Sequence, residues 1–313
     1  MADTSVKGHV SILAASVMWG CMAPIAKVSM NTISPFMLTA LRLMGGALLF
    51  WIFSLFLRKT ERVTPRDFLR LFFASLFAFV INQGLFLTGL SMTSPVDASV
   101  ITTMLPIFTM VLAAFLLREP VSVHKILGIL LGAAGALILI LSTRSRFPNP
   151  NEMSYVSDIL CMLAQLSFAC YLTGFKTLTQ KYSSLTINKW IFTFASICYL
   201  PLTMSDFIKL DFQALPTETV WEVSYVVLFG TFLAYLCYVA GQGLLRPTVV
   251  SMYNYTQPVV ASILAVCMGL GSLTASKLVA VALIFSGVYV VTRSKSRHDL
   301  NRERRVLGKE VRS

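Results

Sequence analysis

The chain has 313 residues, of which 56% are hydrophobic and only 13% are charged. Ordinary soluble domains are roughly 25% charged, and a water-soluble fold of this length could not bury so much apolar surface, so the composition predicts a polytopic, all-helical membrane protein. The net charge of +12 is clustered in a few segments, which argues against a nucleic-acid-binding protein and for topology signals or contacts with anionic lipids.

Ten apolar segments follow one another along the chain. A helix needs about 20 apolar residues to cross roughly 30 Å of hydrocarbon. The predicted spans are residues 9–29, 35–57, 68–89, 95–117, 125–142, 155–175, 187–205, 219–243, 248–270 and 276–293.

The basic residues orient these spans. If the N-terminus is cytoplasmic, 20 Lys and Arg residues lie inside and only 4 lie outside, with two more within spans. The positive-inside rule then predicts a plasma-membrane protein, such as one of a bacterial inner membrane, with both termini cytoplasmic. Residues 294–313 are expected to form a basic cytoplasmic tail, and we expect this tail and the Arg58–Arg70 segment to contact anionic lipids.

The two halves of the chain resemble each other at an offset of 152 residues. This offset pairs Leu76 with Leu228 and Pro106 with Pro258. Five spans per half is an odd number, so the second half must enter the membrane upside down, as in many secondary transporters. The expected organisation is two inverted five-helix repeats around a central cavity, over residues 1–143 and 155–293, joined by an external linker at 144–154.

The paired prolines are predicted to kink or gate their helices. Each lies about 15 Å deep, near the membrane midplane. Proline within a helix frees the carbonyl group four residues back, here that of Thr102 or Asn254. Substrate sites of inverted-repeat transporters lie near the midplane on interrupted helices; a packing kink without a ligand role is the alternative.

Polar and aromatic side chains at mid-membrane depth supply the candidate substrate-binding residues, because such groups are expensive in lipid unless they serve function or join helices. Helical spacing puts Tyr253, Asn254 and Gln257 on one face. Arg42 is the one strong charge well inside a span, and could attract a carboxylate or phosphate or extend toward the interface. The full set is Trp19, Arg42, Asn82, Gln83, Thr102, Tyr171, Tyr235, Tyr253, Asn254 and Gln257.

Several functional classes lack their sequence signals. No Asp or Glu lies at the centre of a predicted span, although proton-coupled carriers often use such a carboxylate; this favours facilitated diffusion, exchange or an unfamiliar coupling site. No nucleotide-binding loop, metal-binding motif or nucleophile motif occurs. We therefore expect neither an enzyme nor a metal or other cofactor.

The motifs together resemble a known family. They are "SVMWG" in the first span, "SPFMLTALRL" in the second, "LTGLSMTSPVDASVITTMLPIFTMVLAAFLLREPVS" and "GILLGAAGALILI" later in the first half, and "LLRPTVVSMYNYTQPVVASILAV" and "SGVYVV" in the second half. Over residues 8–293 the chain resembles the EamA-type branch of the drug/metabolite transporter superfamily. The resemblance implies ten helices, a central cavity, alternating access and small-metabolite substrates, commonly amino acids. One departure is Gly271, which stands where a second copy of Glu119 would be expected.

The predicted function is a secondary transporter that moves a small organic metabolite, amino-acid-like and outward, across the plasma membrane. Alternatives are an importer of a vitamin or nucleoside-like solute, a flippase subunit for a lipid-linked carrier, or a non-transporting membrane scaffold. The partners implied are a small-molecule substrate and membrane lipids, and no nucleic acid. Substrate identity, coupling ion and oligomeric state are left open by the sequence.

Overall fold

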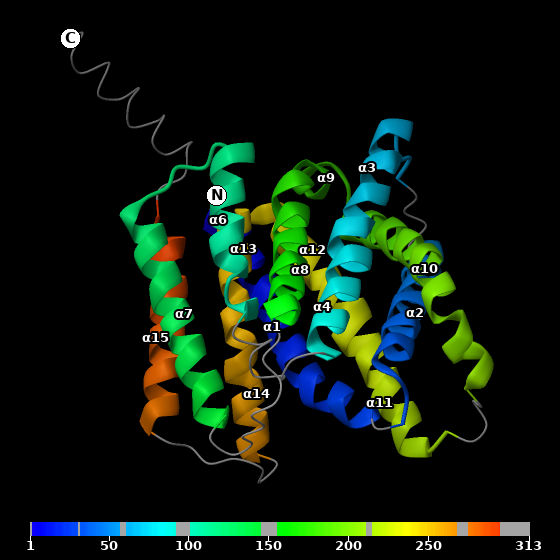
Figure 1. The fold of residues 1–313 in the computed structure, drawn as a ribbon. Helices are drawn as coiled ribbons and strands as arrows, with labels where there is room; N and C mark the ends of the chain where they lie inside the picture. Colours follow the sequence, from blue (N-terminus) through cyan, green and yellow to red (C-terminus); the bar gives the residue numbers. More distant parts are fainter. Residues whose placement is uncertain are drawn as a thin grey trace, which may run out of the picture.

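The computed structural model describes residues 2–30, 32–56, 61–91, 101–144, 155–210, 215–267 and 275–294. Regular structure within these ranges is entirely helical (Figure 1). The first half contains α1 (Ala2–Ser29), α2 (Pro35–Phe56), α3 (Pro65–Ser75), a π-helical segment η1 (Leu76–Val80), α4 (Ile81–Ser91), α6 (Leu105–Leu116) and α7 (Val123–Arg144).

The second half repeats this order. It contains α8 (Tyr155–Gly174), a short α9 (Lys176–Lys181), α10 (Ser184–Lys209), α11 (Thr217–Val227), a second π-helical segment η2 (Leu228–Leu233), α12 (Ala234–Leu244), α13 (Pro247–Met252), a 3₁₀ turn η3 (Tyr253–Tyr255), α14 (Thr256–Cys267) and α15 (Ala275–Thr292). Most described helix ends lie within a few residues of the predicted ends, because long apolar runs bounded by polar or proline residues define them well.

The helices have the length and surface of a multi-pass membrane protein. Among the described residues, Pro35–Phe56, Pro65–Gly89, Ser184–Ile208 and Thr217–Leu244 are long and apolar enough to cross a membrane, and five shorter apolar helices accompany them. Large apolar side chains point away from the protein: Phe56, Phe115 and Ile208 are 82%, 78% and 79% exposed. Such faces suit lipid rather than water. The count of ten spans stays a prediction.

Contacts between helices follow the same pattern in both halves. Helix α1 packs against α12 and α14, and its counterpart α8 packs against α4 and α6. The remaining major pairs are α2 with α10 and α7 with α15, each joining equivalent helices of the two halves; α7 and α15 run side by side in Figure 1. The first helix of each half therefore packs against the third and fourth helices of the other half, as expected for two halves related by an approximate twofold axis.

Both predicted kink prolines lie at interrupted helices, but not inside a continuous helix. The backbone turns at Thr103–Met104, and Pro106 is the second residue of α6. In the second half η3 interrupts the chain, and Pro258 is the third residue of α14. Proline is favoured in a first helical turn, where its missing N–H would have no helical partner anyway. The prolines therefore restart each helix beyond a break rather than bend it.

Glycines allow α7 and α15 to pack closely. A Cβ atom added to Gly287 on α15 would lie 2.5 Å from the carbonyl oxygen of Gly128 and 2.7 Å from the amide nitrogen of Gly132, both on α7. Small residues at this spacing let two helix backbones approach closely within a membrane. The α7–α15 pair is thereby a direct backbone-to-backbone contact between the halves.

Candidate substrate-binding site

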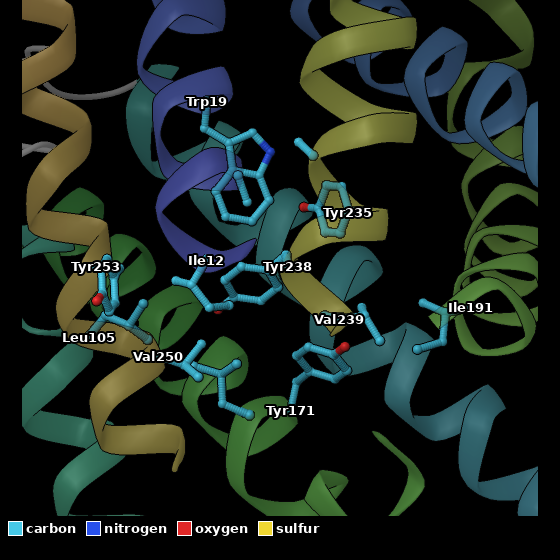
Figure 2. Close-up of a cluster of buried hydrophobic side chains, with 14 of the residues drawn as sticks. Ile12, Trp19, Leu105, Tyr171, Ile191, Tyr235, Tyr238, Val239, Val250 and Tyr253 are labelled. Carbon is cyan, nitrogen blue, oxygen red and sulfur yellow. The ribbon is translucent and has the colours of Figure 1, made fainter. Parts of the chain in front are cut away.

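Trp19 is a buried residue of α1 whose side chain faces α12. Figure 2 shows its indole facing the rings of Tyr235 and Tyr238, at centroid distances of 5.0 and 4.8 Å. The indole Nε1 donates a hydrogen bond of 3.0 Å to the carbonyl oxygen of Gly230. Because the indole N–H is satisfied by the backbone, the ring is held in one orientation, and an aromatic wall forms from both halves of the chain.

The Gly230 carbonyl belongs to η2, and the π-helical geometry explains why it is available. A π-helical turn displaces the regular backbone hydrogen bonds and often occurs at functional sites. The Thr231 hydroxyl donates to the Val226 carbonyl at 2.9 Å. The equivalent segment η1 begins at Leu76, the repeat partner of Leu228, and its Phe77 carbonyl accepts a 2.8 Å hydrogen bond from Ser167 of α8. Each half thus offers a backbone carbonyl to the first helix of the other.

Arg42 extends from α2 to the same π-helical segment. Its Nε donates to the Thr231 hydroxyl at 3.2 Å, next to the residue that binds Trp19. Within the described part of the chain, the ion pairs do not include Arg42. A guanidinium carries five N–H donors, so Arg42 retains donors that a carboxylate or phosphate could use.

Four buried side chains have a polar atom without a hydrogen-bond partner among the residues that the structure describes, namely Ser16, Tyr199, Tyr238 and Gln242, and two of these side chains lie on α12. The atoms on α12 are the Tyr238 hydroxyl and the Gln242 Nε2, and both side chains are fully buried. The Gln242 Oε1 accepts from the Tyr171 hydroxyl at 3.2 Å. A buried group without a partner costs about 1–3 kcal/mol and calls for an explanation such as a ligand or an ordered water. The side chains of Tyr171, Gln242 and Tyr238 therefore form a polar patch that could bind a ligand or an ordered water.

The helix break at η3 makes contacts across the molecule. The Tyr253 hydroxyl lies 2.8 Å from Nδ1 of His9 on α1. The Tyr255 hydroxyl donates at 2.8 Å to the carbonyl oxygen of Thr103, its partner in the repeat, within the break of the first half. The two breaks are thus joined directly. The carbonyl that is bound is that of Thr103, one residue beyond the expected Thr102, which is itself half-buried.

The polar face expected around Asn254 is divided by the 3₁₀ turn. Gln257 Nε2 donates to Asn254 Oδ1 at 3.0 Å, while Tyr253 contacts α1. Residue spacing in a 3₁₀ turn is tighter than in an α-helix, so the regular face predicted from α-helical spacing is interrupted here. Asn254 and Gln257 are half-buried and satisfy each other in part.

Asn82 and Gln83 lie at the start of α4. Asn82 Nδ2 donates to the Ala164 carbonyl of α8 at 2.8 Å, and Gln83 Nε2 donates to Asn82 Oδ1 at 3.2 Å. An amide that bonds a neighbouring helix contributes to helix association. These two residues therefore join α4 to α8, whatever further role they have.

Comparison with known proteins identifies the family. The EamA-like transporter family matches residues 6–141 and, a second time, residues 156–293. The chain belongs to the EamA-like transporter family. A crystal structure of another protein matches this chain with a TM-score of 0.76 over 93% of this chain and 97% of that chain, at 18% identity, and so shares the fold.

Relatives of this EamA-family chain occur in bacteria, archaea and plants. It is 23% identical to the uncharacterized transporter YetK of Bacillus subtilis, over 93% of this chain and 88% of YetK. It is 23% identical to an uncharacterized transporter of Archaeoglobus fulgidus, over 88% and 95% of the two chains. Protein WALLS ARE THIN 1 of Arabidopsis thaliana is 25% identical over 92% of this chain and 83% of its own. The chain is thus a membrane transporter.

The predicted site residues of this EamA-family protein fall into separate groups. Trp19 and Tyr235 are in contact, and Arg42 reaches the same η2 segment. Tyr171 is linked to them through Phe168, which stacks on Tyr238 at 6.2 Å. The separate contacts described above are made by Asn82, Gln83, Tyr253, Asn254 and Gln257. Thr102 is half-buried, and Pro106 and Pro258 lie in the first turns of α6 and α14.

Four residues of the site were not in the predicted set. Tyr238 and Gln242 share a face of α12 with Tyr235, and their three- and four-residue spacing is a signal that could have identified them. Thr231 and His9 gave no comparable signal. The partner of Thr231 is 189 positions away and that of His9 is 244 positions away, and only the fold brings them together.

Proposed function

We propose that this transporter moves a small amphipathic organic anion or zwitterion, such as an amino-acid-like metabolite, outward across the plasma membrane by alternating access. Its pocket lies near the midplane, around Trp19, Tyr235 and Tyr238. Arg42 supplies charge for a carboxylate, and the aromatic rings supply an apolar surface. Tyr171, Tyr253, Asn254 and Gln257 extend the lining in other states of the cycle.

One observation carries the proposal. The Tyr238 hydroxyl, at the aromatic wall shared by the two halves, and the Gln242 Nε2, one turn further along α12, are buried without partners in the described part of the chain. An apolar side chain at position 238 would stabilise the fold better, because an unpaired buried hydroxyl adds nothing to stability. A polar group of a substrate, or a water displaced by it, satisfies both donors.

The test is comparative efflux from cells loaded with a uniformly ¹³C-labelled amino-acid mixture and a broader metabolite panel. Wild type is compared with Tyr238→Phe and with the control Tyr289→Phe, an exposed residue of α15. Loss of one substrate hydrogen bond should slow efflux by about tenfold in Tyr238→Phe, at unchanged thermal stability. The control should match wild type.

Two results would count against the proposal. If wild type releases no compound faster than cells without the protein, outward transport of these metabolites is wrong. Uptake of vitamin- or nucleoside-like solutes and flipping of a lipid-linked carrier are then measured. If wild type is active but Tyr238→Phe has the same rate and selectivity, the pocket is placed wrongly. A non-transporting scaffold would tolerate every substitution in the pocket.

We further infer the topology that this mechanism needs. Both termini are cytoplasmic, the repeats are residues 1–143 and 155–293, residues 144–154 form an external linker, and the basic tail 294–313 contacts anionic lipids. The excess of basic residues on one side and the double family match support this arrangement. Labelling of single cysteines introduced at residues 149 and 305 by an impermeant thiol reagent, in a variant lacking the native cysteines, tests it in intact cells.

A further inference from the structure

His9 is an ionisable side chain of α1 placed against a helix break of the other half. Its Nδ1 lies 2.8 Å from the Tyr253 hydroxyl, and the two ring centroids are 5.9 Å apart. His9 is half-buried, and Tyr253 is 8% exposed. Tyr253 begins η3, so the contact joins α1 to the turn from which α14 restarts.

The chemistry of the two groups sets the direction of this hydrogen bond. A phenol is a better donor than a neutral imidazole N–H, and an unprotonated ring nitrogen is a better acceptor than a phenol oxygen. In the neutral state, Tyr253 therefore donates to Nδ1, and the ring hydrogen is on Nε2. An unperturbed imidazole titrates near pH 6.5, within the physiological range.

Protonation reverses the bond. The added proton occupies Nδ1, which then donates to the Tyr253 oxygen, and the hydroxyl hydrogen must turn to another acceptor. A positive charge is also placed between α1 and η3. Tyr253 is held by its side chain to α1, while its carbonyl accepts a 2.6 Å bond from the Thr256 hydroxyl in the next helix, so a change at the phenol acts directly on the break.

We infer that His9 is a proton-binding residue that couples protonation to movement of the break at Tyr253–Tyr255, so that transport by this chain depends on pH through His9. This rests on the proposed transport function. It supplies a coupling site in a chain whose predicted spans have no central carboxylate. It also gives a role to a titratable residue of α1 that contacts the helix break of the other half.

Other ionisable groups surround α1. The elements packed against it are α11, η2, α12, η3 and α14. Lys176 is engaged with carbonyl groups at the end of α12, and Arg246 with the Ser294 carbonyl. The titratable residues of those elements and of α1 itself are Glu218, Glu222, Tyr225, Tyr235, Cys237, Tyr238, Tyr253, Tyr255, Cys267, Asp3, Lys7, Cys21 and Lys27. The hydrogen-bonding partner of the imidazole in this set is Tyr253.

The first experiment needs no substrate. Histidine ring and tyrosine Cζ atoms are ¹³C-labelled in the full-length protein in lipid nanodiscs, and spectra are recorded between about pH 5.5 and about pH 7.5. His9→Gln and Tyr253→Phe assign the two signals, and His124→Gln is the matched control, since His124 is an exposed residue at the start of α7. We expect the Tyr253 signal to change with the His9 titration and to become insensitive to pH in His9→Gln. A Tyr253 signal that is constant with pH in wild type, or that still changes in His9→Gln, would overturn the inference.

The second experiment measures release of the ¹³C-labelled amino-acid mixture from vesicles containing the purified protein. Over this pH range the neutral fraction of an ordinary imidazole changes by about tenfold. Wild type and His124→Gln should therefore change rate several-fold, and His9→Gln should have a nearly constant rate. If His9→Gln keeps the wild-type pH profile, the inference is wrong although the transport function stands. If wild type releases none of the mixture at any pH, the proposed function fails, and the spectra alone decide the role of His9.

Discussion

Lys176 is a buried cation whose role follows from its backbone partners. It is 7% exposed and donates to the carbonyl oxygens of Gln242 and Leu245, the latter at 2.6 Å. These carbonyls end α12, where the helix dipole is negative and regular hydrogen bonds are lacking. Lys176 thus fixes the C-terminal end of the helix that carries Tyr235, Tyr238 and Gln242.

Replacing Lys176 with methionine should lower the free energy of unfolding by about 2–4 kcal/mol, because two carbonyl groups lose their donor. The measurement is thermal unfolding of the purified protein in detergent. Lys181→Met is the matched control on the same short helix. The Lys181 side chain is 53% exposed where it pairs with Asp67, and Asp67 keeps its bonds from Thr64 and Tyr182 without it, so we expect a smaller loss in Lys181→Met. Equal losses in the two variants would contradict the capping role.

The pH dependence of stability gives a second readout for Lys176. Burial lowers the pKa of Lys176 to about 8 from its usual 10.5, against the opposing attraction of Glu119. Between these two values the unfolded chain binds more protons than the folded one, so the free energy of unfolding rises with pH across that window. The Lys176→Met variant should lack this rise.

At the scale of elements, η2 is the feature on which the proposed pocket depends. Thr231 donates to Val226 and accepts from Arg42, so Thr231→Val removes both bonds, and Thr231→Ser retains the hydroxyl. We expect Thr231→Val to destabilise the protein by about 1–3 kcal/mol and to slow efflux by about tenfold. Thr231→Ser should stay near wild type in the same efflux and unfolding assays. If Thr231→Val has wild-type efflux, the hydrogen bond between Arg42 and Thr231 plays no part in transport, and the prediction is wrong.

The elements also show what a single sequence can predict. The spans follow from runs of apolar residues, and the positions of the breaks follow from Pro106 and Pro258 because proline interrupts regular backbone hydrogen bonding. The π-helical segments could not be predicted, since their residues read as ordinary apolar helix. Their equivalence became visible only when the structure placed one at Leu76 and the other at Leu228.

The same limit applies to the candidate site. Trp19 and Tyr235 were predicted because their size and polarity are unusual at that depth. The bond between Trp19 and Gly230, and that between His9 and Tyr253, join residues more than 200 positions apart through a backbone carbonyl or a single hydroxyl. Neither contact produces a local pattern in the sequence, so neither could be predicted without the three-dimensional arrangement of the helices.

At the scale of the whole molecule, the α7–α15 contact should control whether the halves stay together. Gly287→Ala places a methyl group against the α7 backbone, which must shift, so we expect a loss of about 1–3 kcal/mol or more. Gly84→Ala in α4 is the control. Its added Cβ meets nothing within 4 Å, and replacing glycine in a helix should stabilise by about 0.5–1 kcal/mol. Measuring the free energy of unfolding of both variants in detergent tests whether it falls in Gly287→Ala and rises in Gly84→Ala.

The bond from Tyr255 to the Thr103 carbonyl joins two residues that the repeat makes equivalent. Equivalent residues can touch only near the axis that relates the halves. If the halves exchange roles during transport, the mirrored state would need residue 103 to supply what Tyr255 supplies now, and a threonine side chain is too short to replace a tyrosine. In such a cycle the two end states would be unequal in energy, and this asymmetry would give the carrier a resting orientation that its symmetric architecture alone would not have.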